Sequence, residues 1–184
     1  MLDASTTDFF GYYPGTVALV TAQHDGQRNV MSAGWHAACS SRPPMYGVAI
    51  GPERATHALV TAAGRFGINF LTADSTRAVQ GAGVLSLHDG HDKFARLGLD
   101  TLDDPAHPPA LAAAYLYYSC RVEQVMRTGD HDWFVGRVEQ VRFERAAFDE
   151  ARLALPEVPV YLGRSAYVRA GGEREVHPPQ HFEE

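Results

Sequence analysis

The chain carries two long strand-like segments, residues 113–127 and 132–144, with only the short stretch 128–131 between them. Both segments are rich in apolar, β-branched and aromatic residues, which favour strands, and Gly129 and Asp130 favour a chain reversal. So short a connection joins antiparallel neighbours, because parallel strands need a crossover of about a dozen residues or more. The two segments therefore predict a long β-hairpin, around which the rest of the fold has to be built.

Further strand-like runs are spread along the chain. Asp25-Gly26 is a strong tight-turn signal and predicts a second hairpin from the two runs that flank it. Pro43-Pro44 introduces the next run, since proline cannot continue a strand ladder. The expected strands are residues 16–22, 29–40, 45–51, 65–71, 158–162 and 165–169.

Short helices are expected between these strands. Residues 56–64 have helical spacing of apolar residues, with Thr56 as the expected N-cap and Gly64 as the end. Other short helices are expected over 74–83 and 92–98 and near 147–152. Because strands outnumber helices and hairpins dominate, the sequence predicts a mainly β fold, an antiparallel barrel with short peripheral α-helices. A parallel nucleotide-binding sheet is disfavoured, because no strand–G-x-G-x-x-G–helix unit is present in the sequence.

Composition limits the kind of protein this can be. The 184 residues are 45% hydrophobic and 21% charged, the balance of a soluble globular protein. We expect one domain over 1–170 and a loose tail over 171–184. The net charge of −6 argues against a nucleic-acid partner. Neither a secretory signal nor a membrane-spanning stretch is evident, so we expect a cytoplasmic location and no membrane partner.

Residues 29–44 form a strand-like stretch that is poor in bulky side chains. Alternation puts Val30, Ser32, Gly34 and His36 on one face. Two interpretations stay open at this point. Another backbone or sheet can approach closely, or a flat ligand can lie against the strand and be reached by its backbone groups.

Arg54 and Thr56 stand at the expected start of the 56–64 helix. Unpaired backbone N–H groups, the helix dipole, the Thr56 hydroxyl and the Arg54 guanidinium together make a competent phosphate cradle. The alternative is a helix that merely caps itself. Lys93 is the one lysine of the chain, and it lies beside an aromatic residue at a helix start, where it could meet a ligand phosphate or an anionic ring.

Two stretches combine histidine with aspartate and are candidate sites. His88, Asp89, His91 and Asp92 lie close together in the sequence, but no third distant ligand is obvious and such a loop more often solvates itself, so we expect no metal site. His131 lies between Asp130 and Asp132. This cluster is either a working acid–histidine group at the mouth of a site or a polar turn that opens a strand.

Together these segments resemble the flavin reductase-like, FMN-binding split-barrel family, and most closely its flavoredoxin-type branch. The resemblance covers about residues 10–168 and rests on the order and spacing of its motifs. It departs at His88, where these proteins often carry Ser-Gly. The stretches that carry it are residues 12–70, "DKFARLGL", "YYSCRVEQVMRTGDHDWFVGRVEQV" and "YLGRSAYV".

The resemblance implies an antiparallel split β-barrel with FMN at the interface of a homodimer. His131 would face the flavin ring as the candidate catalytic residue, making a polar contact rather than forming part of a triad. Lys93 would neutralise either the phosphate or the N1–C2=O edge of the flavin. Asp132 and Trp133 are interpreted as structural. The cofactor-binding residues that it implies are Asn29, Ala33, Gly34, Trp35, Ser40, Ser41, Arg54, Thr56, Asn69, Lys93, His131 and Tyr167.

The implied activity is that of an NAD(P)H-dependent flavin reductase. Hydride from NADH or NADPH would enter the flavin, and the electrons would pass to free flavin, a flavin-dependent monooxygenase or another redox partner. Two alternatives stay open: a flavoredoxin-type electron-transfer protein that is reduced by a protein partner, and an FMN-binding protein without turnover.

Overall fold

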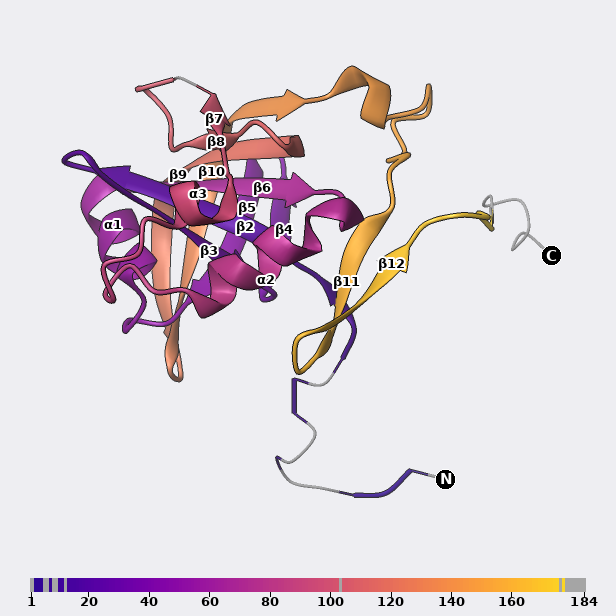
Figure 1. The fold of residues 1–184 in the computed structure, drawn as a ribbon, viewed down its shortest axis with the longest axis horizontal. Helices are drawn as coiled ribbons and strands as arrows, with labels where there is room; N and C mark the ends of the chain where they lie inside the picture. Colours follow the sequence, from indigo (N-terminus) through magenta and orange to yellow (C-terminus); the bar gives the residue numbers. More distant parts are fainter. Residues whose placement is uncertain are drawn as a thin grey trace.

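A computed structural model describes residues 2–4, 7, 10, 11, 13–102, 104–175 and 177 (Figure 1). Of the predicted tail, residues 176 and 178–184 lie outside the described residues. The last strand ends at Ala170. The division into one domain and a tail stays a prediction.

Seven strands form the main sheet, in the order β3-β2-β6-β9-β10-β5-β4. Every neighbouring pair in this sheet is antiparallel, which confirms the predicted mainly β, antiparallel fold. The strands are β2 (Ala18–His24), β3 (Gln27–Ala33), β4 (His36–Ser41), β5 (Pro44–Ile50), β6 (Arg65–Leu71), β9 (Ala114–Thr128) and β10 (His131–Phe143).

The expected single strand over 29–40 is wrong: it is two strands that break at Gly34 and Trp35. β3 pairs with β2 and β4 pairs with β5, so the two strands are the opposite edges of the sheet. Two linking residues span at most about 7 Å beyond the strand ends. The sheet must therefore curl until its edges meet, which makes an open barrel whose edges are joined by the chain rather than by a ladder.

The predicted long hairpin is confirmed as β9 and β10, which are paired from His131↔Thr128 to Phe143↔Leu116. Its register shifts at Val135/Gly136 and again at Val138/Gln140, so the ribbon is bulged and bends with the barrel. Gly136 lies at the first shift. A Cβ atom there would stand 2.8 Å from Cys120 Cβ and 2.8 Å from the Phe66 ring, so the backbone approaches the core too closely for any side chain.

Alternation along β2 divides the hydrophobic core into two layers. Ala18, Val20 and Ala22 point into the barrel interior, whereas Val17, just before β2, and Leu19 face the helices outside. Both sets are buried, so this strand is covered on both faces. The outer layer positions the functional site, because it packs two helices against β3.

The helices are α1 (Ala55–Ala63), α2 (Thr76–Val84) and α3 (Lys93–Leu97). Gly64 ends α1 in the left-handed conformation with φ 63°, as predicted. Asp92 caps α3 by accepting a hydrogen bond from the Ala95 amide at 3.2 Å. The helix expected near 147–152 is wrong; only a 3₁₀ turn, η2 (Arg145–Ala147), forms there. None of the helices within the described ranges is long and apolar enough to cross a membrane.

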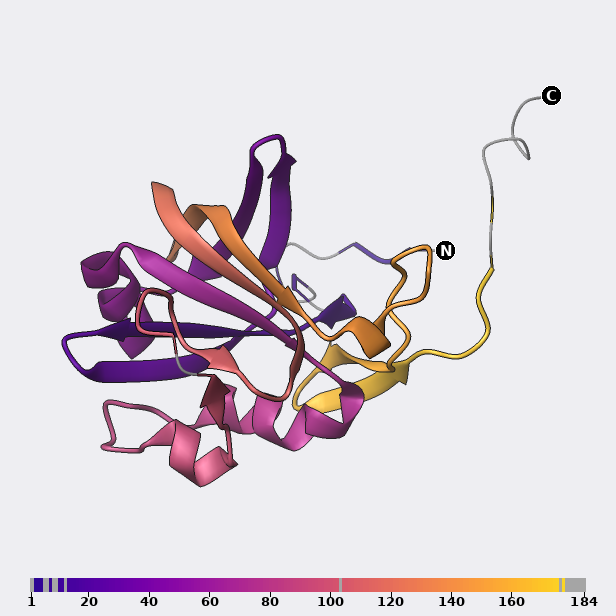
Figure 2. The same ribbon diagram turned by 90° about the horizontal axis from the view of Figure 1, so that it is seen from above.

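Two smaller sheets flank the barrel (Figure 2). One contains β1 (Gly15–Thr16), β11 (Val158–Gly163) and β12 (Ala166–Ala170); the other pairs β7 (Thr101–Leu102) with β8 (Ala110–Leu111). His36 joins β1 to the barrel: one ring nitrogen lies 3.2 Å from the Thr16 carbonyl oxygen and the other 2.7 Å from the Tyr46 hydroxyl. Burial lowers the pKa of His36, which favours the neutral ring in this position.

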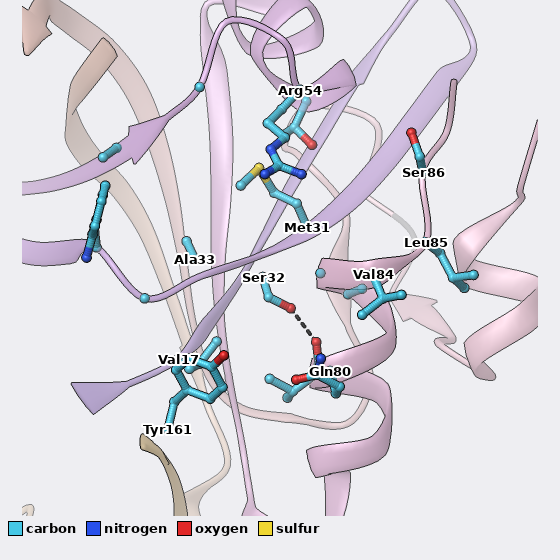
Figure 3. A pocket seen from close by; sticks show the side chains of 18 of the residues that line it. Val17, Met31, Ser32, Ala33, Arg54, Gln80, Val84, Leu85, Ser86 and Tyr161 are labelled. Atoms are coloured by element: carbon cyan, nitrogen blue, oxygen red, sulfur yellow. Dashed lines mark hydrogen bonds between the residues drawn. The ribbon is translucent and has the colours of Figure 1, made fainter. Parts of the chain in front are cut away.

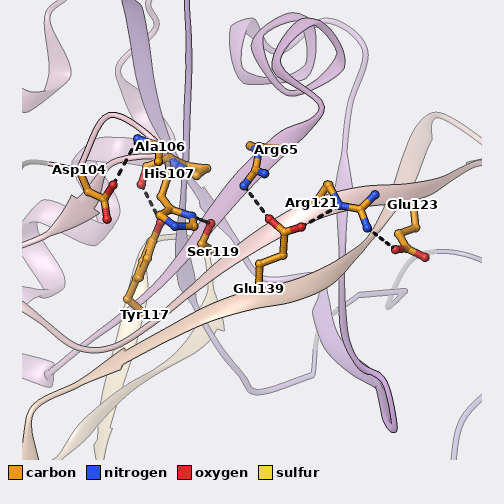
Figure 4. Close-up of polar contacts among 10 residues, drawn as sticks. Arg65, Asp104, Ala106, His107, Tyr117, Ser119, Arg121, Glu123 and Glu139 are labelled. Carbon is orange, nitrogen blue, oxygen red and sulfur yellow. Dashed lines mark hydrogen bonds and ion pairs between the residues drawn. The ribbon is translucent and has the colours of Figure 1, made fainter.

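A charged ladder crosses the outer face of the barrel (Figure 4). Glu139 forms an ion pair with Arg65 at 2.7 Å and accepts a hydrogen bond from Arg121 at 2.8 Å, and Arg121 also donates to Glu123 at 2.9 Å. The ladder joins β6, β9 and β10 across their register. Its members are partly exposed, so each pair contributes little to stability alone.

Candidate functional site

A cavity of about 540 Å³ opens between β3, the start of α1, α2 and the β11–β12 hairpin. Figure 3 shows Arg54 at one end and Tyr161 at the opposite end, with Ser32 and Ala33 of β3 between them. The fold brings most of the predicted site residues here, although they come from distant parts of the chain. Those that line the cavity are Asn29, Ala33, Gly34, Trp35, Arg54, Thr56, Lys93, His131 and Tyr167.

Ser40, Ser41 and Asn69 are not among the lining residues. Ser40 and Ser41 are at the far end of β4, beyond the break in the predicted strand. Asn69 is fully buried in the barrel wall, where its amide donates to the Leu19 carbonyl at 3.1 Å and accepts from the Leu111 amide at 2.8 Å. These contacts make Asn69 a structural tie between strands.

Thr56 lies at the buried end of the cavity, in the first turn of α1. The expectation that it caps the helix is wrong, because Arg54 occupies the N-cap position with an extended backbone. The Thr56 hydroxyl oxygen instead accepts a hydrogen bond from the Asn29 side-chain amide at 2.9 Å. The side-chain carbonyl oxygen of Asn29, Oδ1, is buried and has no hydrogen-bond partner in the described part of the chain. It is therefore available to a ligand donor.

Arg54 stands at the same end but is more open. Its guanidinium is 57% exposed and forms an ion pair with Glu53 at 3.0 Å. Glu53 also lines the cavity, so a ligand anion at this end would share Arg54 with a carboxylate. The backbone N–H groups of the first turn of α1 add the positive end of the helix dipole.

Lys93 contributes a buried ammonium group. Its side chain is 5% exposed, and Nζ donates to the carbonyl oxygens of Val30 and Ala82, both at 2.9 Å. Burial, and secondarily the charge of Arg54, lowers the pKa of Lys93 to about 8. Both known partners are neutral, and an ammonium has three hydrogens to donate, so a ligand anion would supply a counter-charge. The bond to Val30, the residue after Asn29 in β3, places Lys93 at the same end of the cavity as Thr56. We define the anion end as Arg54, Thr56 and Lys93.

Trp35 and His131 form an aromatic rim on another side of the opening. Their rings are 5.0 Å apart in an edge-to-face arrangement, and Trp35 is 41% exposed. His131 Nδ1 lies 2.8 Å from an Asp130 carboxylate oxygen, and this hydrogen bond lowers the pKa of Asp130. The two interpretations of this cluster, as a turn and as part of a site, are therefore compatible. Asp130 holds His131, and His131 lines the cavity.

The third wall is made by α2 and the β11–β12 hairpin. The Tyr167 hydroxyl donates to the Gln80 side-chain oxygen at 2.9 Å, and the Tyr161 and Tyr167 rings are 5.1 Å apart. Ser32 donates to the Val79 carbonyl, which holds α2 against β3. Tyr167 of this wall was predicted from the sequence, whereas Gln80 and Tyr161 were not. The available signal for this wall was the run of small residues in 81–83, since a Cβ on Gly83 would stand only 3.4 Å from Ser32.

The loop 88–92 does not assemble a metal site. Within the described ranges, no group of three or more His, Cys, Asp and Glu side chains is placed to hold a metal ion. His88 lines the cavity, whereas His91 lies 2.7 Å from the Arg96 guanidinium. Asp92 serves as the cap of α3.

The arrangement suits an elongated ligand with an anionic end and a flat aromatic part. Cationic and hydroxyl donors gather at one end, aromatic rings stand at the rim, and β3 presents small residues between them. The volume lies within the range of about 300–1,000 Å³ that is typical of small-molecule sites.

Comparison with known proteins agrees with this description. A family model described as a flavin reductase-like domain matches residues 10–171. The reductase component of a 4-nitrophenol 4-monooxygenase/4-nitrocatechol 2-monooxygenase from Rhodococcus opacus is 30% identical, over 72% of this chain and 68% of its own. The chain spans 78% of the length of a relative from Pyrococcus abyssi and 49% of one from Aeropyrum pernix.

Two solved structures show the same fold. An FMN-binding protein from Thermus thermophilus, solved with bound 1-cyclohex-2-enone, is 30% identical with a TM-score of 0.85, covering 96% of this chain and 98% of its own. The flavoredoxin of Desulfovibrio vulgaris (Miyazaki F) is 22% identical with a TM-score of 0.83, covering 99% and 100%. The predicted split-barrel architecture is confirmed.

Proposed function

This chain belongs to the flavin reductase-like family and its cofactor is FMN, and from this premise we propose that it is an oxidoreductase that takes hydride from NADH or NADPH and passes electrons to an acceptor. The observation that carries the proposal is that one cavity has the cationic and hydroxyl groups of the anion end on one side and an aromatic rim on another. A phosphate and a flat ring system, linked by a polar chain, match that layout.

The residues fit FMN in detail. Arg54, Thr56 and Lys93 would hold the phosphate, because all three offer hydrogens or positive charge and Lys93 has no ion-pair partner within 13–102 and 104–175. The unpartnered Asn29 carbonyl oxygen calls for a ligand donor, and the ribityl hydroxyls of FMN are donors. Ala33, Gly34 and Trp35, with His131 and Tyr167, would border the ring.

Bound FMN supplies the hydride chemistry, so the chain itself needs no catalytic triad. Its residues bind, orient and expose the cofactor. His131, held by Asp130, would present a polar ring nitrogen beside the flavin, and the edge-to-face contact with Trp35 would fix the imidazole plane. The open rim would admit a nicotinamide only transiently, in keeping with a sequence that has no dinucleotide-binding fingerprint.

The test is an anaerobic mixture of the purified, FMN-loaded full chain with NADH or NADPH, followed by flavin absorbance. Bleaching with either nucleotide, and recolouring by added free FMN or air, is the expected result. A flavin band that persists with both nucleotides would refute the reductase activity. A protein that purifies colourless and gains no flavin from added FMN would contradict the cofactor itself.

A second candidate is a flavoredoxin-type electron-transfer protein. The observation that favours it is the 41% exposure of Trp35 at the cavity rim, which a protein partner could reach. In that case reduced redox proteins would bleach the flavin whereas both nucleotides would not. If neither donor class reduced it, an FMN-binding protein without turnover would be the remaining interpretation.

A homodimer is also proposed. Exposed apolar side chains stand at both ends of the β9–β10 ribbon, Val125 and Met126 near the turn and Val141 and Phe143 at the other end. A second copy of the chain that covers part of this ribbon would remove exposed apolar surface from water. Light scattering during size-exclusion chromatography should give twice the mass of one chain. A cytoplasmic location and a flavin-dependent monooxygenase as electron acceptor are proposed with it, the latter because the Rhodococcus relative is named as the reductase component of a monooxygenase.

A further inference from the structure

His57 and Asp132 form a close pair that lies outside the cavity. His57 Nε2 is 2.7 Å from an Asp132 carboxylate oxygen, and both side chains are 17% exposed. Neither residue is among those that line the cavity. From the sequence, Asp132 is expected to be structural and His57 carries no signal of a role.

The pair joins the two parts of the candidate site. His57 follows Thr56 in the first turn of α1, and Asp132 follows His131 at the start of β10. Consecutive side chains of a strand point to opposite faces, so Asp132 faces α1 while His131 faces the rim. The bond therefore connects the neighbour of Thr56, at the anion end, to the neighbour of His131, at the aromatic rim.

Each partner is itself fixed. The His57 ring packs edge-to-face on the buried Phe134 ring at 5.1 Å, and its amide donates to the Arg54 carbonyl at 2.9 Å. The second oxygen of Asp132 accepts from Arg127 at 3.4 Å, and Arg127 also donates to the Gly129 carbonyl at 2.7 Å. The hydrogen bond from His57, and then the charge of Arg127, lowers the pKa of Asp132, which keeps the carboxylate ionised.

The end of the hairpin depends on such contacts. Residues 123–130 are exposed, so little apolar burial holds that part of the ribbon in place. The ladder between β10 and β5 ends at the pair Asp132↔Ile50. The turn beyond it, which includes His131, could shift relative to α1 without a side-chain bond, because exposed ribbon ends have low local stability. A hydrogen bond of 2.7 Å to a largely buried carboxylate is the kind that fixes a relative position.

We infer that His57 and Asp132 are positioning residues, whose bond sets the anion end and His131 at the spacing that one FMN molecule requires. This inference rests on the proposed function. Neither residue touches the ligand. Loss of the bond would let the start of α1 and the hairpin turn move apart, so a change on one element would alter the function of the other.

The test changes a residue on one element and measures the effect on the other. His57→Leu, on the helix, is examined through the ring ¹⁵N resonances of His131, on the hairpin. Both His57→Leu and Asp132→Asn are examined through the ratio of FMN to riboflavin affinity of the flavin-free full chain, measured by fluorescence titration. Since only FMN carries the phosphate, the expected result is a fall of about 2- to 30-fold in this ratio. His57→Gln retains a donor near the Nε2 position and should restore the ratio.

High salt distinguishes loss of positioning from a through-space effect of charge on FMN binding. Asp132→Asn removes a negative charge near the anion end, which by itself would strengthen FMN binding, and this effect disappears at 1 M salt, where the screening length is about 3 Å. Weaker FMN binding that persists at 1 M salt supports positioning. Stronger FMN binding that salt abolishes would overturn it.

A matched control is His107→Gln. His107 is another partly buried histidine with one short bond, 2.8 Å to the Ser119 hydroxyl, and it does not line the cavity. It should lower the melting temperature without altering the affinity ratio. A wild-type chain that binds neither flavin would overturn the proposed function. A wild-type preference for FMN that His57→Leu leaves intact, with His131 resonances unmoved, would overturn only the inference.

Discussion

The Asn29 amide nitrogen donates to the Thr56 hydroxyl oxygen at 2.9 Å, although the two residues are 27 positions apart. This bond ties β3 to the start of α1 at the buried end of the cavity. Because Asn29 is the donor, the Thr56 hydroxyl hydrogen remains free for a ligand oxygen, and the Asn29 carbonyl oxygen remains an acceptor. One contact thus orients two groups toward the ligand.

Replacing Arg54 and Thr56 together by alanine should weaken FMN far more than riboflavin. Charge-assisted hydrogen bonds contribute about 1.5–3 kcal/mol, so FMN affinity should fall by about 10- to 100-fold. Flavin fluorescence titration measures both ligands. Thr56→Ser is the matched control, since it keeps the hydroxyl and should retain most of the affinity. An equal loss for FMN and riboflavin would contradict the assignment of the anion end.

Lys93→Met should change how the stability of the flavin-free protein depends on pH. The folded chain holds the pKa of Lys93 near 8, below its ordinary value of 10.5. Below pH 8 the ammonium is charged in both states and the fold bears the cost of burying it. Between about pH 8 and 10.5 the folded chain binds fewer protons than the unfolded chain, so its stability rises with pH.

Urea unfolding at pH 7 and pH 9.5 measures this effect. The wild-type free energy of unfolding should rise relative to that of Lys93→Met by about 1–3 kcal/mol. Tyrosines such as Tyr117, whose pKa burial raises to about 12, titrate in both proteins and cancel in the difference. Saturating FMN should reduce the difference, because the phosphate stabilises the charged form. Parallel stability curves for the two proteins would count against a buried, uncompensated ammonium.

His131→Ala should alter turnover or flavin affinity while the protein stays folded. Loss of one hydrogen bond to a charged or polar group corresponds to about a 10-fold change. Stopped-flow reduction by NADH and FMN titration give the two quantities, and circular dichroism reports the fold. His91→Ala is the matched control, since His91 contacts Arg96 away from the rim. Kinetics and affinity that match wild type would leave His131 with only its turn-forming role.

Gly136→Ala should destabilise the fold by about 1–3 kcal/mol, the usual cost of overpacking a core. The added Cβ would stand 2.8 Å from both Cys120 and the Phe66 ring. Gly34→Ala is the control, because a Cβ there meets no atom within 4 Å and the backbone is not left-handed. Thermal unfolding compares the two variants. Equal melting temperatures would mean that the bulge in β10 can relax.

Several features of the fold could be predicted from local sequence. The β9–β10 hairpin, the Gly64 helix end and the Asp92 cap depend on turn and capping residues within a few positions of one another. The interruption of the strand at Gly34 could not be predicted, because alternation alone favours one strand over residues 29–40. It became visible only when β3 and β4 were found on opposite edges of the sheet.

The candidate site divides in the same way. The sequence by itself determined the chemistry: a lone lysine, an arginine and a threonine at a helix start, and a histidine in a turn are fixed by residue type and spacing. Only the tertiary structure decided which of these meet. Lys93 lies at the anion end because its ammonium bonds to Val30 and Ala82, and Asn69 lies away from it because its amide satisfies neighbouring strands. Such pairings join residues far apart in the chain, and only the closed packing of the barrel against its helices selects them.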